Sequence, residues 1–118
     1  MKRIILVEDD PGIQDAILTM LHRKGYEVTS YSGGREIISG TAGIPDLYLL
    51  DNQLTGVNGI DLCRFLKERD ATALLPVIII SASPAVEKLA KWAGADGYLE
   101  KPFDMNELRS LVAKFIGN

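Results

Sequence analysis

Short, uninterrupted apolar runs are the feature that most limits what this chain can fold into. The clearest are Ile4–Val7, Leu47–Leu50 and Pro76–Ile80, the last with proline in first place and four branched residues behind it. A strand with one face in water alternates apolar and polar residues, so an unbroken run indicates a strand that is covered on both faces. Strands of this kind form parallel sheets with helices packed on both sides.

The segments between these runs have the apolar period of helices. In the first of them, Pro11 opens a helix that ends near Gly25. Further strands are predicted at 27–31 and 97–99, and further helices at 33–39, at 59–69, from residue 84 and from an N-cap at residue 104. The strand at 27–31 is more polar, which is typical of a sheet edge. The alternation predicts an α/β fold, a three-layer doubly wound (βα)5 parallel sheet, in a single domain over residues 1–118.

Polar side chains mark the ends of these predicted strands. Glu8 and Asp9 follow the first strand, Asp51 ends the third, Ser81 ends the fourth, and Lys101 follows the fifth. Right-handed crossovers place the C-terminal ends of parallel strands along one edge of the sheet, and ligands bind at that edge. We therefore expect these five residues to converge.

The chemistry of the five residues suits magnesium and phosphate. Three carboxylates at one place repel one another, so a cation is expected among them. Their oxygens suit Mg²⁺, whereas zinc is disfavoured because the chain has one histidine, His22, within a predicted helix, and one cysteine, Cys63. A carboxylate beside Mg²⁺ can attack phosphorus and form an aspartyl phosphate. The Lys101 ammonium would offset the charge on the transferred group, and the Ser81 hydroxyl would hydrogen-bond one of its oxygens.

Four motifs, in this order and at these spacings, resemble the response-regulator receiver domains of two-component phosphorelay signalling. They are Ile5–Pro11, Leu49–Asp51 with Gly56–Gly59 behind it, Ser81-Ala82, and Gly94–Phe103. The resemblance covers essentially the whole chain. It implies the flavodoxin-like receiver fold, with the strand order 2-1-3-4-5.

The resemblance also implies roles for individual residues. Asp51 would be the phosphoacceptor, and Ser81 and Tyr98 would be a switch pair that repacks the face formed by the fourth helix, the fifth strand and the fifth helix. Lys101 would contact the phosphoryl group and be joined to Pro102 by a cis peptide bond. The implied cofactor is Mg²⁺, held by Glu8, Asp9, Asp51 and the backbone carbonyl of Gln53.

Partners follow from the same resemblance. The phosphoryl group would come from the phosphohistidine of a sensor histidine kinase or a histidine phosphotransfer protein, or from a small acyl phosphate. A downstream effector or output domain would respond to phosphorylation, and the phosphorylated chain could form a homodimer. Such a domain promotes its own phosphorylation and dephosphorylation without turning over a separate substrate, so it is not expected to act as a conventional enzyme.

A few features depart from the usual pattern of the family. Thr55 stands where proline is common. Gln53 and Ser83 occupy positions that in the family tune how long the phosphate survives, and Ser83 is also predicted to cap the fourth helix. The segment from Ser81 to Tyr98 is about two residues, or half a helical turn, shorter than usual.

Charge and hydropathy limit the remaining possibilities. A net charge of -3 provides no basic surface for direct nucleic-acid binding. The apolar runs are far shorter than the roughly 18 residues of a membrane span. These features predict a cytoplasmic domain, and no part of the chain resembles an output domain. Trp92 lies outside the apolar stripe of its helix, and both exposure as a contact surface and burial against a loop are open.

Other functions also remain open at this stage. A receiver-like domain can serve as an interaction module without phosphorylation, although the acidic residues, Ser81 and Lys101 are all present. The run Asp51–Thr55 resembles the Asp-x-Asp-x-Thr signature of aspartate-nucleophile phosphatases, but Gln53 replaces the second aspartate and no substrate cap is evident. A dinucleotide-binding module is disfavoured because no glycine-rich loop follows the first strand.

Overall fold

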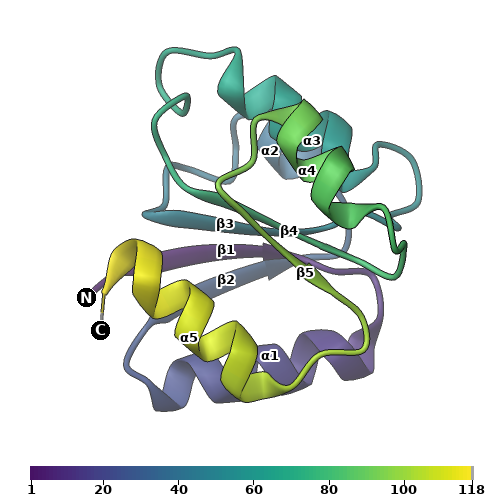
Figure 1. The fold of residues 1–118 in the computed structure, drawn as a ribbon. Coiled ribbons are helices and arrows are strands. Elements are labelled where there is room, and N and C mark those ends of the chain that lie inside the picture. Colours follow the sequence, from purple (N-terminus) through teal and green to yellow (C-terminus); the bar gives the residue numbers. More distant parts are fainter. Residues whose placement is uncertain (118) are drawn as a thin grey trace.

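The computed structural model describes residues 1–117 of the chain. Within them, five parallel strands form one sheet in the order β2-β1-β3-β4-β5 (Figure 1). The strands are β1 (Arg3–Val7), β2 (Glu27–Tyr31), β3 (Leu47–Asp51), β4 (Val77–Ser81) and β5 (Gly97–Glu100), and the helices are α1 (Pro11–Arg23), α2 (Arg35–Ser39), α3 (Gly59–Lys67), α4 (Val86–Ala93) and α5 (Met105–Ile116). The α/β class, the doubly wound parallel sheet and its strand order are as predicted.

The helices form two layers, one on each face of the sheet. Helices α1 and α5 cover one face, and α2, α3 and α4 cover the other (Figure 1). Because successive side chains of a strand point to opposite faces, each inner strand contributes to two separate cores. In β1, for example, Ile4 and Leu6 pack in the core beneath α1 and α5, and Ile5 and Val7 pack in the core beneath α3 and α4. This two-sided burial is why the inner strands are unbroken apolar runs, whereas the edge strands β2 and β5 are more polar and more exposed.

Side-chain caps fix where three of the helices begin. The Asp10 carboxylate accepts two backbone N–H groups of α1, at 2.9 and 3.0 Å. Asn58 caps α3, and Asp104 forms a reciprocal capping box with Glu107 at the start of α5. The cap predicted at residue 104 is therefore confirmed. The caps at Asp10 and Asp104 start α1 and α5 shortly after the strands that precede them, which keeps the loops at this edge of the sheet short.

Helix α5 runs antiparallel to the strands, so it links the end of the sheet where the strands finish to the end where they begin (Figure 1). It begins near the C-terminal ends of the strands and finishes beside the start of β1 and β2 (Figure 1). The Tyr26 hydroxyl, just before β2, donates a hydrogen bond to the Gly117 carbonyl. None of the helices in residues 1–117 combines the length and the apolar character that crossing a bilayer requires.

The start of α4 and the role of Ser83 differ from the prediction. The helix begins at Val86, not at Pro84, and its N-cap is Ala85, which makes no side-chain cap hydrogen bond. The Ser83 hydroxyl accepts from the Ala85 N–H at 3.1 Å, and the Ser83 carbonyl accepts from the Val86 N–H at 3.2 Å. These bonds close a tight turn over residues 83–86, so the prediction that Ser83 caps the helix is wrong.

Two other helices are also shorter than the sequence indicates. Helix α3 ends at Lys67 rather than at Arg69. The Arg69 N–H turns to the Leu66 carbonyl at 3.3 Å, and the Thr72 hydroxyl donates to the same carbonyl at 2.6 Å, so the chain tightens into a turn. Helix α2 begins at Arg35 because glycines precede it, and glycine is a poor helix former.

Candidate functional site

Three carboxylates meet at the C-terminal edge of the sheet. Glu8 and Asp9 follow β1 directly, and Asp51 is the last residue of the neighbouring β3. Each offers one carboxylate oxygen, and these oxygens all lie within 4.8 Å of one another. The Glu8 and Asp51 residues are only 1% and 2% exposed, whereas Asp9 is exposed. The predicted convergence of the three carboxylates is confirmed, and the cluster is open to solvent on the Asp9 side.

A lysine reaches this cluster from the end of β5. The Lys101 Nζ lies 3.2 Å from Asp51 Oδ1 and 3.3 Å from Glu8 Oε1. The Lys101 backbone N–H donates to the Ser81 carbonyl at 2.8 Å, which holds the two strand ends together. Its peptide bond to Pro102 is cis, as predicted. Lys101 therefore bridges two buried carboxylates, at the place predicted for it.

Burial and nearby charges shift the pKa values of Glu8 and Lys101. Burial raises the pKa of the Glu8 carboxyl, and the nearby Asp51 charge adds to the rise, while the Asp10 N–H at 3.2 Å and the Lys101 ammonium oppose it. Burial lowers the pKa of Lys101, but the charges of Asp51 and Glu8 outweigh burial, so this pKa rises. The ammonium is therefore firmly charged, and the Glu8 carboxylate is the group that is costly to ionise.

The Asp51 carboxylate is held by charge rather than by well-aligned hydrogen bonds. Its Oδ1 atom is buried and, despite the nearby Lys101, has no hydrogen bond of acceptable geometry within residues 1–117. One ammonium cannot balance the Asp51, Glu8 and Asp9 carboxylates together, and a divalent cation would supply the remaining positive charge. Mg²⁺ takes oxygen ligands and keeps several of its waters, which the open Asp9 side can accommodate. The donor set present here therefore fits Mg²⁺.

Ser81 lies at the neighbouring strand end and is held there by a glutamine. The Ser81 residue is fully buried at the end of β4. Gln53, in the loop behind Asp51, donates from Nε2 to the Ser81 Oγ at 2.8 Å and accepts with Oε1 from the Ala82 N–H at 3.2 Å. The sequence placed the Gln53 carbonyl among the metal ligands and Gln53 at a position that in the family tunes the phosphate lifetime, but it did not indicate this side-chain bridge. No motif signals the bridge, because it depends on the path of two loops.

Two aromatic side chains lie on the surface near α4. Tyr98 of β5 is 39% exposed, so its ring is not packed in either core. Trp92 is 61% exposed, and the Arg64 guanidinium of α3 stacks on its ring at 4.1 Å from the centroid. Of the two possibilities that the sequence left open for Trp92, the structure shows exposure.

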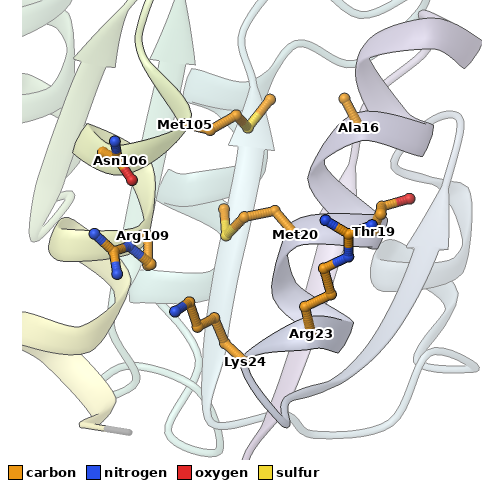
Figure 2. Close-up of a pocket in the computed structure, with 8 residues that line it drawn as sticks. All are labelled: Ala16, Thr19, Met20, Arg23, Lys24, Met105, Asn106 and Arg109. Carbon is orange, nitrogen blue, oxygen red and sulfur yellow. The ribbon is translucent and has the colours of Figure 1, made fainter.

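A separate groove of about 570 Å³ lies between α1 and α5 (Figure 2). Met20 and Met105 line its floor, and the basic side chains of Arg23, Lys24 and Arg109 surround it. None of the clustered carboxylates and no part of Lys101 lines this groove. The groove is therefore separate from the carboxylate cluster at the strand ends.

Comparison with known proteins decides the family. A family model described as the response regulator receiver domain matches residues 4–113. The chain belongs to this family. The transcriptional regulator RpaA of Synechocystis, described as DNA-binding, is 36% identical over 118 residues, and the phosphate regulon regulatory protein PhoB of Rhizobium meliloti is 38% identical over 117 residues. Each match covers 95% of this receiver domain but 48% and 51% of the respective relative, so the chain spans about half the length of these relatives.

Solved structures show the same receiver fold. The receiver domain of a Pseudomonas aeruginosa sensor histidine kinase, with a magnesium ion in its active-site cleft, has a TM-score of 0.87 and 30% identity and covers 99% of this chain and 98% of that one. The response regulator TrrA of Thermotoga maritima, in complex with Mg²⁺ and beryllofluoride, has a TM-score of 0.85 and 30% identity, with 98% and 99% covered. The prediction of a receiver domain is thus confirmed.

Proposed function

We propose that this receiver domain accepts a phosphoryl group on Asp51, with Mg²⁺ bound by Glu8, Asp9, Asp51 and the backbone carbonyl of Gln53. The observation that carries the proposal is the environment of Asp51. Its carboxylate is buried at a strand end, with the Lys101 ammonium 3.2 Å from Oδ1 and two further carboxylates beside it. A carboxylate with a purely structural role would be exposed or fully hydrogen-bonded. The Mg²⁺ and Mg²⁺–beryllofluoride complexes of similar receivers support the same assignment.

The transfer step uses groups that the structure brings together. An Asp51 oxygen attacks phosphorus and forms a new P–O bond, while the P–N bond of a phosphohistidine breaks and its electron pair stays on the imidazole nitrogen. With a small acyl phosphate, the bond to the acyl oxygen breaks and the pair stays on the released carboxylate. Lys101 would hold one oxygen of the transferred group, and the Ser81 hydroxyl would donate to another. Mg²⁺, when bound, offsets the negative charge of the phosphoryl oxygens.

Ser81 and Tyr98 would pass the signal to the surface. Ser81 would move toward the phosphoryl oxygen and leave space beside β5. The pKa of the exposed Glu87 carboxyl is lowered, chiefly by a hydrogen bond and charge from Lys91 and also by a hydrogen bond from the Tyr98 hydroxyl. Because Tyr98 is 39% exposed, its side chain lies at the surface, and an inward rotation would repack the face of α4, β5 and α5. That face would bind the effector, the output domain or a second copy of the chain.

A phosphoryl donor has to reach Asp51 from the open end of the sheet. A largely apolar hollow of about 480 Å³ lies there, lined by the start of α1 around Ile13, by Ala82 and by the loop from Lys101 to Phe103. An apolar surface around a single cation suits a docked protein whose reactive phosphohistidine enters beside Lys101. We propose a sensor histidine kinase or a histidine phosphotransfer protein as this partner.

The remaining assignments concern the chain as a whole. We propose that residues 1–118 are a single receiver domain that acts in the cytoplasm and turns over no separate substrate. A net charge of -3 supports the absence of direct nucleic-acid binding by this domain. Because RpaA is described as DNA-binding and is about twice as long as this domain, the output is proposed to lie outside these residues, in the same polypeptide or in a separate effector.

The decisive experiment is to incubate the domain with acetyl phosphate and Mg²⁺ and to measure its intact mass. We expect the mass of one added phosphoryl group, which is lost when EDTA replaces Mg²⁺ or when Asp51→Asn is used. Labelling that persists in Asp51→Asn would place the acceptor elsewhere. A wild-type domain that stays unmodified, and that also fails to bind beryllofluoride, would instead favour an interaction module that needs no phosphorylation.

A further inference from the structure

Asp9 is the exposed member of the carboxylate cluster. Glu8 and Asp51 are buried and lie 3.3 and 3.2 Å from the Lys101 ammonium, which holds them in place. The Asp9 side chain, in contrast, has no hydrogen bond and no ion pair within residues 1–117. A carboxylate that is not held can adopt any rotamer that its backbone allows. The direction in which Asp9 points therefore depends on how its backbone is fixed.

Gln14 of α1 fixes the peptide group that precedes Asp9. Its Nε2 donates to the Glu8 carbonyl at 3.0 Å. The orientation of the amide is unambiguous, because a carbonyl oxygen can only accept. On the other side of Asp9, the Asp10 N–H donates to the Glu8 carboxylate at 3.2 Å. Asp9 thus lies between two peptide groups, each of which is held by a side chain.

Helix α1 is a firm support for this contact. Asp10 caps the helix, and the Gln14 N–H donates to the Asp10 carbonyl at 2.9 Å as the first turn closes. Ile17 and Leu21 of the same helix are fully buried in the core. Because a helix packed in this way does not move freely, the Gln14 amide ties the acidic turn of residues 8–10 to a fixed element.

We propose that Gln14 is a positioning residue for magnesium, which fixes the acidic turn so that the Asp9 carboxylate points toward Glu8 and Asp51 before the ion binds. The proposal rests on the function proposed above for Asp51 and assigns to it a determinant of metal affinity that is not itself a ligand. Groups that hydrogen-bond directly to a metal ligand change the metal affinity by about tenfold to a hundredfold. Gln14 acts through one peptide group, so its removal should weaken Mg²⁺ binding by about threefold to tenfold.

Two substitutions test the contact. Gln14→Met keeps the length of the side chain and removes the amide, whereas Gln14→Asn keeps the amide and shortens its reach. Both should raise the Kd for Mg²⁺ alone, measured by titration calorimetry, by about threefold to tenfold. Thr19 is exposed further along the same helix, so Thr19→Val is the control and should bind Mg²⁺ like the wild type. Circular dichroism of the metal-free proteins verifies that each variant is folded.

A double-mutant cycle shows whether Gln14 acts through Asp9. In an Asp9→Asn background the carboxylate that needs positioning is gone, so Gln14→Met should change the Kd by less than about twofold. Mn²⁺ prefers the same oxygen ligands, and its electron paramagnetic resonance signal reports binding for all four proteins of the cycle. An equal change in both backgrounds would mean that Gln14 supports the fold in general, and it would overturn the positioning role.

The metal dependence of phosphorylation gives an independent readout. In Gln14→Met, the Mg²⁺ concentration for half-maximal labelling by acetyl phosphate should rise by the same factor as the Kd. The rate at saturating Mg²⁺ should not change, because no group proposed to contact the phosphoryl oxygens is altered. An unchanged Kd in both Gln14 variants would overturn this proposal and leave the phosphoacceptor function intact. A wild type that binds no Mg²⁺ would overturn both.

Discussion

Gly59 lies where α3 meets the backbone of β3, directly behind the proposed phosphorylation site. A Cβ at this position would lie 2.4 Å from the Asp51 carbonyl oxygen and 3.0 Å from the Asn52 Cα. Ordinary contact begins near 3.4 Å, so Gly59→Ala forces α3 and β3 apart by about 1 Å. Neither side can yield freely, because β3 is buried throughout and the Ile60 N–H is bonded to Asn52 Oδ1 at 3.1 Å.

The expected loss follows from these contacts. Overpacking of this kind costs about 1–3 kcal/mol, and a strained or lost Asn52–Ile60 hydrogen bond adds about 1 kcal/mol. We therefore expect Gly59→Ala to lower the free energy of unfolding by about 2–4 kcal/mol, which a typical domain survives. Urea unfolding followed by circular dichroism measures this loss. Mg²⁺ affinity should fall as well, because Asp51 shifts with its carbonyl.

Gly33→Ala is the control for this prediction. A Cβ at Gly33 would have nothing within 4 Å, and its backbone does not need a positive φ. Its free energy of unfolding should therefore stay within about 0.5 kcal/mol of the wild-type value. If Gly59→Ala proves as stable as Gly33→Ala, the close approach of α3 does not constrain Asp51 and the reasoning is refuted.

Three further predictions concern polar groups that are buried or partly buried. Glu8→Gln should raise the free energy of unfolding of the metal-free domain at neutral pH by about 1 kcal/mol, because a buried carboxylate is removed. The pKa of Glu8 is raised above 4.5, so the Glu8 carboxyl stabilises the fold below pH 4.5, and this stabilisation is lost as the pH rises through the raised pKa. The stability advantage of Glu8→Gln over the wild type should therefore grow over this pH range when urea unfolding is measured at a series of pH values. A stability difference that stays constant with pH would contradict this cause. Lys67→Met should lower the free energy of unfolding by about 2–3 kcal/mol, because the lysine amine donates to the Leu75 carbonyl at 2.8 Å and pairs with Asp96 at 2.8 Å. Thermal unfolding measures this loss, and an unchanged Tm would refute the prediction. Burial raises the pKa of the Cys63 thiol to about 11, so a thiol reagent at mildly alkaline pH should label the folded domain far more slowly than the urea-unfolded chain, and equal rates would show that the thiol is accessible.

The inner strands and the charged cluster could be predicted because both follow from burial and topology. A strand such as Val77–Ser81 is covered on two faces, and its unbroken apolar run records that fact directly in the sequence. Once the strands are known to be parallel, their C-terminal ends must share an edge. The meeting of Glu8, Asp51 and Lys101 therefore needed no knowledge of loop conformation.

The loops could not be predicted in the same way, because local preferences there point to more than one structure. Pro84 favours the first turn of a helix, but it equally favours the second position of a β-turn. The hydrogen bonds of Ser83 decide for the turn, and they depend on where β4 ends. The Gln53 bridge to Ser81 is another case, since residues 28 positions apart are joined by the path of two loops.

The hydrogen bond from the Tyr26 hydroxyl to the Gly117 carbonyl holds the end of α5 where the strands begin, at the end of the sheet opposite to Asp51. A five-residue strand is about 17 Å long, so roughly that distance separates the chemistry from the point where the described chain leaves the domain. The end of α5 and the carboxylate cluster around Asp51 therefore lie at opposite ends of the sheet (Figure 1). A fluorescent protein or surface anchor fused behind α5 should leave access to Asp51 unobstructed. A partner fused there by a short rigid joint should respond to the proposed phosphorylation through the sides of the receiver rather than by contact with Asp51.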